Sequence, residues 1–355
     1  MQVGAIDQKT SSKMANMAIV CAVLVVVMHV VPRPSEGFGW YLLQGGHGFL
    51  CRIAVPYFFL AAGYFLAGHF NDEHWWGKEL KKRVHSLLIP FFVFNVLFLI
   101  QDVLIWLVAV VVRGGSFADF SLLNINIILR CLGLNLWRTP YLGPLWFVRN
   151  LFILVLLAPA LKFILDGRLK GFVALFLMFL VYGAFRPFTG EFPFHCTNTI
   201  LCYGFSLEGL FYFALGLFLR MNKIGVPSGI LVGCLCGCIA LTLFGLKIFS
   251  ILRGYVWQYY SWLSIPPLMV FVWSLVPSVK WPFCVVGNAF PVFLIHKFLV
   301  VVLVRIMWTG GWMRQEMHVF LYIVSIVIVI SASFLCALLL RKIAPKASVV
   351  MFGGR

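Results

Sequence analysis

The stretch Leu321–Leu340, LYIVSIVIVISASFLCALLL, decides the fold class, because it is almost continuously apolar and carries no charge. Met17–Val31, MAIVCAVLVVVMHVV, has the same character near the N-terminus. About 20 apolar residues in a row are enough to cross the hydrocarbon core of a bilayer as a helix. Strands of a transmembrane barrel would alternate polar and apolar residues, and these stretches do not. Both stretches therefore predict membrane-spanning α-helices.

The composition extends this prediction to the whole chain. Of 355 residues, 62% are hydrophobic and 11% are charged, and the mean hydropathy is +1.00. One soluble core cannot bury so much apolar surface, which excludes a soluble enzyme, a DNA-binding domain and a coiled coil. Roughly 220 apolar residues are material for ten or eleven helices. We expect an all-α polytopic membrane helix bundle of about ten transmembrane helices, formed by one domain over residues 1–355.

Charged or Pro/Gly-rich breaks separate the apolar runs and define ten predicted spans. They cover residues 15–32, 48–68, 86–112, 143–163, 171–187, 198–219, 228–249, 255–276, 283–307 and 317–340. The fifth is short for a span. The longest break, Arg113–Leu142, mixes Asn and Arg with apolar residues, and it predicts an amphipathic stretch at a membrane surface.

The basic residues predict the orientation. The chain has 28 Lys and Arg against 11 Asp and Glu, a net charge of +17. With a cytoplasmic N-terminus, 16 of the 28 fall on the cytoplasmic side, where clusters such as Lys78–Arg83 are compact. Both ends, 1–14 and 342–355, are then polar cytoplasmic tails. Because topology explains the charge, we expect the lipid bilayer and no nucleic acid as a partner.

The ten cysteines predict neither a disulfide framework nor a metal site. Several fall inside apolar spans, where cysteine packs as a small hydrophobe. The closest group, Cys234, Cys236 and Cys238, has neither metal-ligand spacing nor nearby histidines. We therefore expect no bound metal.

Ionisable residues within the apolar spans are the candidate functional residues. A charged Arg, Lys or Asp at a helix centre costs about 2.5–3.5 kcal/mol or more, so each such residue suggests a site. The alternatives to a functional role are structural: a neutral histidine bonded to a backbone carbonyl, an ion pair for Arg149, and an arginine partner for Glu208. The residues are His29, Arg52, Arg149, Glu208, and His296 with Lys297.

Four short patterns follow one another along the chain. They are Arg52–Leu66 (RIAVPYFFLAAGYFL), Lys81–Phe91 (KKRVHSLLIPF), Pro144–Phe152 (PLWFVRNLF) and Phe290–His296 (FPVFLIH). Together and in this order they resemble the acyltransferase-3 family of integral membrane acyltransferases. The likeness lies in a second helix with proline, aromatics and a small-Gly-aromatic step, a basic loop entering the third helix, a Trp-Phe step and a late aromatic-Leu-x-His step.

The resemblance implies transfer of an acyl group, usually acetyl, from cytoplasmic acyl-CoA to a hydroxyl of a surface or periplasmic carbohydrate or lipid-linked glycan at the cell inner membrane. The family's first-helix histidine matches His29. The arginine that precedes it by eleven residues is Ala18 here, and the serine before the second-helix glycine is Ala62. A histidine suits the role of general base for a sugar hydroxyl, so we expect His29 in that role with His296 assisting.

The remaining residues are assigned to the two substrates. Acyl-CoA is a donor substrate, with no tightly bound cofactor, and the donor-binding residues are expected to be Lys81, Lys82 and Arg83. Ordinary positive-inside anchoring would explain the same cluster. The expected substrate-binding residues are Arg52, Trp146, Arg149 and Glu208, of which Trp146 and Arg149 share a helical face. The alternative function is a secondary transporter of a small anionic solute or acyl compound, which would release no CoA.

Overall fold

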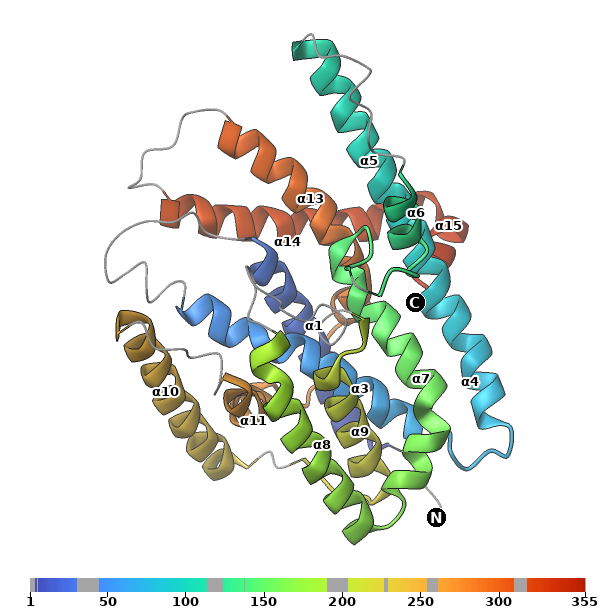
Figure 1. Ribbon diagram of the computed structural model, residues 1–355, viewed down its shortest axis with the longest axis vertical. Coiled ribbons are helices and arrows are strands. Elements are labelled where there is room, and N and C mark those ends of the chain that lie inside the picture. The colour runs from blue at the N-terminus through green and yellow to red at the C-terminus, as the bar shows by residue number, and fades with distance from the viewer. Residues whose placement is uncertain are drawn as a thin grey trace.

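The chain folds into a bundle of α-helices (Figure 1). The computed structural model describes residues 4, 6–30, 45–113, 124–136, 138–189, 204–226, 229–253, 261–309 and 318–354, and these residues include no strand. Seven of the helices in this part are long and apolar enough to cross a membrane. The prediction of an all-α polytopic membrane helix bundle is confirmed.

Each predicted span contains a helix. The first half of the chain forms α1 (Gln8–His29), α3 (Ala54–Ala67), α4 (Trp75–Arg83), α5 (Ile89–Arg113), α6 (Ile125–Cys131) and α7 (Trp146–Leu165). The second half forms α8 (Arg168–Thr189), α9 (Leu207–Met221), α10 (Ile230–Arg253), α11 (Ile265–Leu275), α12 (Phe283–Val286), α13 (Ala289–Thr309), α14 (His318–Ile343) and α15 (Pro345–Met351). Residues 45–50 are also helical and enter α3 through a 3-10 turn, Cys51–Ile53. Residues 198–203 and 255–260, which begin the sixth and eighth predicted spans, lie outside the described residues.

Helices α3 and α9 cross at the centre of the bundle, and two glycines allow this close approach (Figure 1). A Cβ atom on Gly63 would lie 2.1 Å from the carbonyl oxygen of Phe213, and one on Gly216 would lie 2.0 Å from that of Leu60. Small residues let helix backbones touch within a membrane, where helices cannot associate through the hydrophobic effect. Helix α1 packs on α3 and on α13, so the first and late helices meet beside this crossing.

The helix that contains the third predicted span begins before that span. Helix α4, a π-helical turn (Val84–Leu88) and α5 follow without a break, and the stretch Trp75–Val112 spans 38 residues. At 1.5 Å per residue, this is roughly 57 Å, far more than the ~30 Å of the hydrocarbon core. The basic cluster at residues 78–83 therefore lies on a helix that extends past the hydrocarbon core, rather than on a loop.

The described residues near both ends form helices rather than free tails, while the cytoplasmic location of these ends stays a prediction. At the N-terminus, Asp7 caps α1, and Lys13 is 9% exposed with its ammonium 5.0 Å from the ring centre of Trp273. At the C-terminus, α15 packs against α5, and the Phe352 that follows α15 is fully buried. Apolar side chains such as Phe352 explain the difference, because they bury surface that a solvated tail would expose.

The described part of the break between residues 113 and 142, namely 124–136 and 138–142, lies only partly at the surface. Helix α6 has no buried residue, as expected of a helix that lies at a surface. The loop after α6 turns inward instead, and Leu142 is 1% exposed with its N–H donating to Oδ1 of Asn95. The buried amide of Asn95 supplies the acceptor that this loop needs to leave water.

Contacts between distant segments define two ends of the bundle. At one end Asn16 donates to the carbonyls of Pro277 and Val279, and Lys162 donates to that of Phe70. This end carries the segments that the Lys/Arg bias places in the cytoplasm, and we name it the basic end. At the opposite end, Lys247 donates to the carbonyl of Gly45, and His47 bonds to that of Val27.

Candidate active site

Two histidines from opposite parts of the sequence meet in the bundle. His29 is the last residue of α1, and His296 lies on α13. Their ring centres are 4.9 Å apart, and the rings are inclined by 57°. His296 is fully buried, and His29 is half-buried. The packing of α1 on α13 therefore brings together the two residues predicted to be catalytic.

Hydrogen bonds to backbone carbonyls determine which ring nitrogen carries the hydrogen when each of these imidazoles is neutral. Nδ1 of His29 lies 2.8 Å from the carbonyl oxygen of Val25, and Nδ1 of His296 lies 2.7 Å from that of Phe293. A carbonyl oxygen only accepts, so Nδ1 carries the hydrogen and Nε2 carries the lone pair. Nε2 of His296 is buried and has no partner within the described part of the chain. Each ring can therefore accept a proton through Nε2 from a bound hydroxyl.

Aromatic rings connect the histidine pair to the start of α7. Phe293 lies 6.0 Å from His296 and 5.7 Å from Phe147, and Phe147 lies 4.8 Å from Phe59. Phe59 in turn is 6.3 Å from Trp146. Trp146, predicted from its position on the Arg149 face of α7, thus belongs to an aromatic wall that reaches the histidines.

Arg149 contacts the loop that follows α6. Its Nη1 donates to the carbonyl oxygens of Gly133 at 3.2 Å and Asn135 at 3.0 Å, and the residue is 7% exposed. Gly133 has φ +72°, and a Cβ there would lie 2.9 Å from the ring of Phe91. The guanidinium therefore holds a loop that turns inward, and the conformation and space at position 133 suit only glycine.

Glu208 lies in the first turn of α9, not in the middle of a span as the sequence suggested. Its carboxylate accepts a hydrogen bond from the hydroxyl of Tyr182 at 2.8 Å. The free N–H groups of a first helical turn stabilise negative charge, which reduces the cost of this carboxylate. The ion pairs between described residues include none that joins Glu208 to Arg149.

Arg52 lies in the 3-10 turn at the start of α3 and is half-buried. Its neighbours Cys51 and Ile53 are buried, so the turn is anchored in the core. The turn places Arg52 near the beginning of the helix that carries Phe59 and Gly63.

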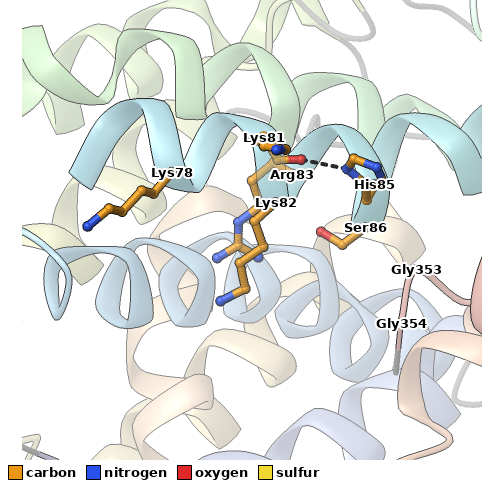
Figure 2. Close-up of a pocket in the computed structure, with 8 residues that line it drawn as sticks. All are labelled: Lys78, Lys81, Lys82, Arg83, His85, Ser86, Gly353 and Gly354. Atoms are coloured by element: carbon orange, nitrogen blue, oxygen red, sulfur yellow. Dashed lines mark hydrogen bonds between the residues drawn. The ribbon is translucent and has the colours of Figure 1, made fainter. Parts of the chain in front are cut away.

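The predicted donor-binding residues line a pocket of about 480 Å³ at the basic end (Figure 2). The pocket is formed by Lys78, Lys81, Lys82, Arg83, His85, Ser86, Gly353 and Gly354. Two carboxylates offset part of its charge. Lys78 pairs with Asp72, and the hydrogen bond from Lys78, together with one from the backbone N–H of His74, holds the pKa of Asp72 below its ordinary value.

Glu79 is the second carboxylate, and it is buried. It lies 3.0 Å from Nη2 of Arg83 and 3.5 Å from Nζ of Lys82, and Nε2 of His69 approaches it to 3.4 Å. Lys81 forms no ion pair with any described residue. The pocket keeps an excess of positive charge, with Lys81 and the exposed Lys82 as its most available cations.

The family is decided by a match to a family model described as an acyltransferase domain, which covers residues 17–342. The chain belongs to the acyltransferase-3 family. This acyltransferase is therefore a multi-pass membrane enzyme. No curated protein and no solved structure matches it.

Two buried asparagines hold the segments that lead into α9 and α7, and neither was identified from the sequence. Asn150 accepts from the N–H of Ser206 at 2.8 Å and is 1% exposed. Asn95 is 0% exposed and binds the loop before α7 through Leu142. An amide within an apolar run was the available signal, because a buried amide needs partners as a charge does.

The described residues of the acyltransferase contain no group of three or more His, Cys, Asp and Glu side chains that could hold a metal ion. On this part of the chain, imidazoles can supply acid–base chemistry, and lysine and arginine can supply charge and hydrogen bonds.

Proposed function

We propose that the protein transfers an acyl group, in particular acetyl, from cytoplasmic acyl-CoA to a hydroxyl of a surface or periplasmic carbohydrate or lipid-linked glycan. Membership of the acyltransferase-3 family supports the reaction class. The donor would bind at the basic end, and the acceptor would arrive from the opposite end, beside His29. The enzyme would then act in the cell inner membrane, with both substrates meeting inside the bundle.

The pair formed by His29 and His296 carries this proposal. In the reaction, Nε2 of one imidazole takes the proton of the acceptor hydroxyl while the oxygen attacks the thioester carbonyl carbon. The C–S bond of the resulting tetrahedral intermediate then breaks, and the departing thiolate takes the proton from the imidazolium. The products are an ester and free CoA, and the histidines return to their starting state.

His29 is the better candidate for the general base. It is half-buried at the end of α1, whereas His296 is fully enclosed. A base has to lie within hydrogen-bond reach of the incoming hydroxyl, so the more accessible ring suits this role. His296 would assist by accepting a hydrogen bond at its unpartnered Nε2 or by orienting His29.

The spacing between the basic end and the histidines suits a long donor. Gln101 of α5 donates to the carbonyl of Phe298, two residues after His296, so these residues lie at one level. Ser86, at the donor pocket, comes fifteen residues before Gln101, a rise of about 22 Å along the helix. The pantetheine arm of acyl-CoA would cover this depth while the phosphates stay in the aqueous pocket.

Substrate-binding roles remain proposed for Arg52, Trp146, Arg149 and Glu208. The contact of Arg149 with Gly133 and Asn135 supports a role in shaping the loop beside Trp146. The guanidinium would act by position, while Trp146 offers an aromatic face to a sugar or acyl group.

The test uses the purified full-length protein in lipid nanodiscs with acetyl-CoA, and it measures CoA release by mass spectrometry together with acetylation of cellular glycans. We expect His29→Ala to lower turnover by about 10²–10⁴-fold, the usual contribution of a general base. His74→Ala, in an exposed loop, is the matched control and should keep full activity. Activity of His29→Ala near that of the control would refute the assignment, and wild-type protein without CoA release would refute the proposed reaction.

A further inference from the structure

One side of the donor pocket is formed by residues near the C-terminus rather than by the basic cluster. Helix α15 ends at Met351, and the Phe352 that follows is fully buried with its ring 6.5 Å from that of Phe94. The next residues, Gly353 and Gly354, have φ of +66° and +77°, and the N–H of Gly354 donates to the carbonyl of Val349 at 2.7 Å. This left-handed turn is firmly closed and lies at the edge of the pocket.

The glycine turn lies directly against Ser86. A Cβ on Gly353 would lie 2.6 Å from both Cα and the carbonyl oxygen of Ser86, a distance that no side chain tolerates. Figure 2 shows Gly353 and Gly354 approaching Ser86, with the hydroxyl of Ser86 directed to the side on which Lys82 and Arg83 project. The C-terminal turn therefore closes the pocket over this serine.

The hydroxyl of Ser86 is held without a partner. Ser86 is 6% exposed, and its Oγ forms no hydrogen bond with any described residue. A helical serine commonly bonds back to the carbonyl four residues earlier, but Ser86 lies in the π-turn Val84–Leu88, where the N–H of Ile89 reaches the carbonyl of Val84. Such π-turns occur frequently at functional sites. Because Ser86 lines the pocket, its unpartnered hydroxyl is available to a ligand bound there.

We propose that this pocket binds a phosphate group of the nucleotide end of acyl-CoA, with Ser86 donating to it and the Gly353–Gly354 turn closing the site. This inference rests on the proposed function, because it assigns residues to the donor. Lys81 and Lys82 supply the charge, and a serine hydroxyl adds a directed hydrogen bond to an anionic oxygen. The pocket volume of about 480 Å³ lies in the usual range for small-molecule sites.

The test measures binding of 3′,5′-ADP and CoA to the full chain in nanodiscs made only of zwitterionic phosphatidylcholine. We expect Ser86→Ala to raise the Kd of both about tenfold, which is typical of a lost hydrogen bond to a charged group. Gly353→Ala should raise it further, because the turn must move away from Ser86. Ser333→Ala is the matched control, since Ser333 is a buried helical serine whose hydroxyl has no partner among the described residues and which does not line the pocket. Its Kd should stay at the wild-type value.

Thermal unfolding and lipid competition complete the test. Ser86→Ala should keep the wild-type Tm, because the lost hydroxyl has no protein partner to strand. An unchanged Kd in Ser86→Ala and Gly353→Ala, with normal CoA release by the wild type, would overturn this inference and leave the proposed function intact. Two results together would show that the pocket binds a lipid headgroup and that the nucleotide assignment is wrong. The first is displacement of 3′,5′-ADP from the wild type by phosphatidylglycerol. The second is weak binding of CoA that does not differ from that of dephospho-CoA.

Discussion

Replacing Gly63 by alanine tests whether the small-Gly-aromatic step of the second helix serves the crossing of α3 and α9. The added Cβ would lie 2.1 Å from the carbonyl oxygen of Phe213, whereas real Cβ contacts essentially never fall below 3.0 Å. The atom in the way is backbone, so no side-chain rotation relieves the contact. The two helices would have to separate by about 1 Å, and overpacking of this kind typically costs 1–3 kcal/mol.

Gly245 offers a matched control for the same chemical change. It lies within α10, and a Cβ there would meet no atom within 4 Å. Replacing a helical glycine by alanine in open space stabilises a helix by roughly 0.5–1 kcal/mol. The same substitution is therefore expected to have opposite signs at the two sites.

The assay is thermal unfolding of the purified variants in one detergent, combined with CoA release. We expect a lower Tm for Gly63→Ala and an equal or higher Tm for Gly245→Ala, with Gly216→Ala behaving as Gly63→Ala does. Activity should fall with the first and third variants, because α3 and α9 carry Arg52 and Glu208 at their starts. If Gly63→Ala and Gly245→Ala unfold at the same temperature, the close crossing is not what requires glycine.

Three further predictions concern the site. Reversing the charge of Lys81 and Lys82 to glutamate should raise the KM for acetyl-CoA more than it lowers kcat, and the difference should shrink at high salt; an unchanged KM at low salt would place the donor elsewhere. Asn150→Ala should lower the Tm by the equivalent of about 1–3 kcal/mol, because a buried N–H at the start of α9 loses its acceptor. Arg149→Gln should lower stability and activity, and Glu208→Gln added to it should not restore either, since no described ion pair joins the two residues. Recovery in that double variant would show that the two charges depend on each other.

The sequence was sufficient to locate the predicted spans, because the length of an apolar run can be read directly from neighbouring residues. Every predicted range holds a helix, including the short fifth one, where α8 runs from Arg168 to Thr189. At the third span the helix extends before the predicted range for a physical reason. Lysine, arginine and glutamate are good helix formers in water, so a hydropathy pattern cannot show where a helix that leaves the membrane ends.

The site was predictable only as a set of residue types. An ionisable group in an apolar run indicates a function, but it does not say which groups meet. The meeting of His29 with His296 depends on the packing of α1 against α13, which are separated by most of the chain. Glu79 illustrates the opposite case. It stands among basic residues, and its local sequence gives no sign of burial, yet folding buries it beside Arg83 and Lys82.

The separation between the donor pocket and the histidines has a chemical consequence. A thioester beside a basic imidazole is open to attack by water, and the product of that attack is wasted donor. Phe298 lies 5.2 Å from Phe98 and 5.9 Å from Phe94, so aromatic rings occupy the level between the pocket and His296. Apolar walls exclude water from the region that the acyl group would cross, while the charged phosphates stay at the basic end. On this reasoning Phe298→Ala should raise CoA release in the absence of any acceptor relative to release with acceptor. An unchanged ratio would mean that water is kept from the thioester elsewhere, at the acceptor side near His29.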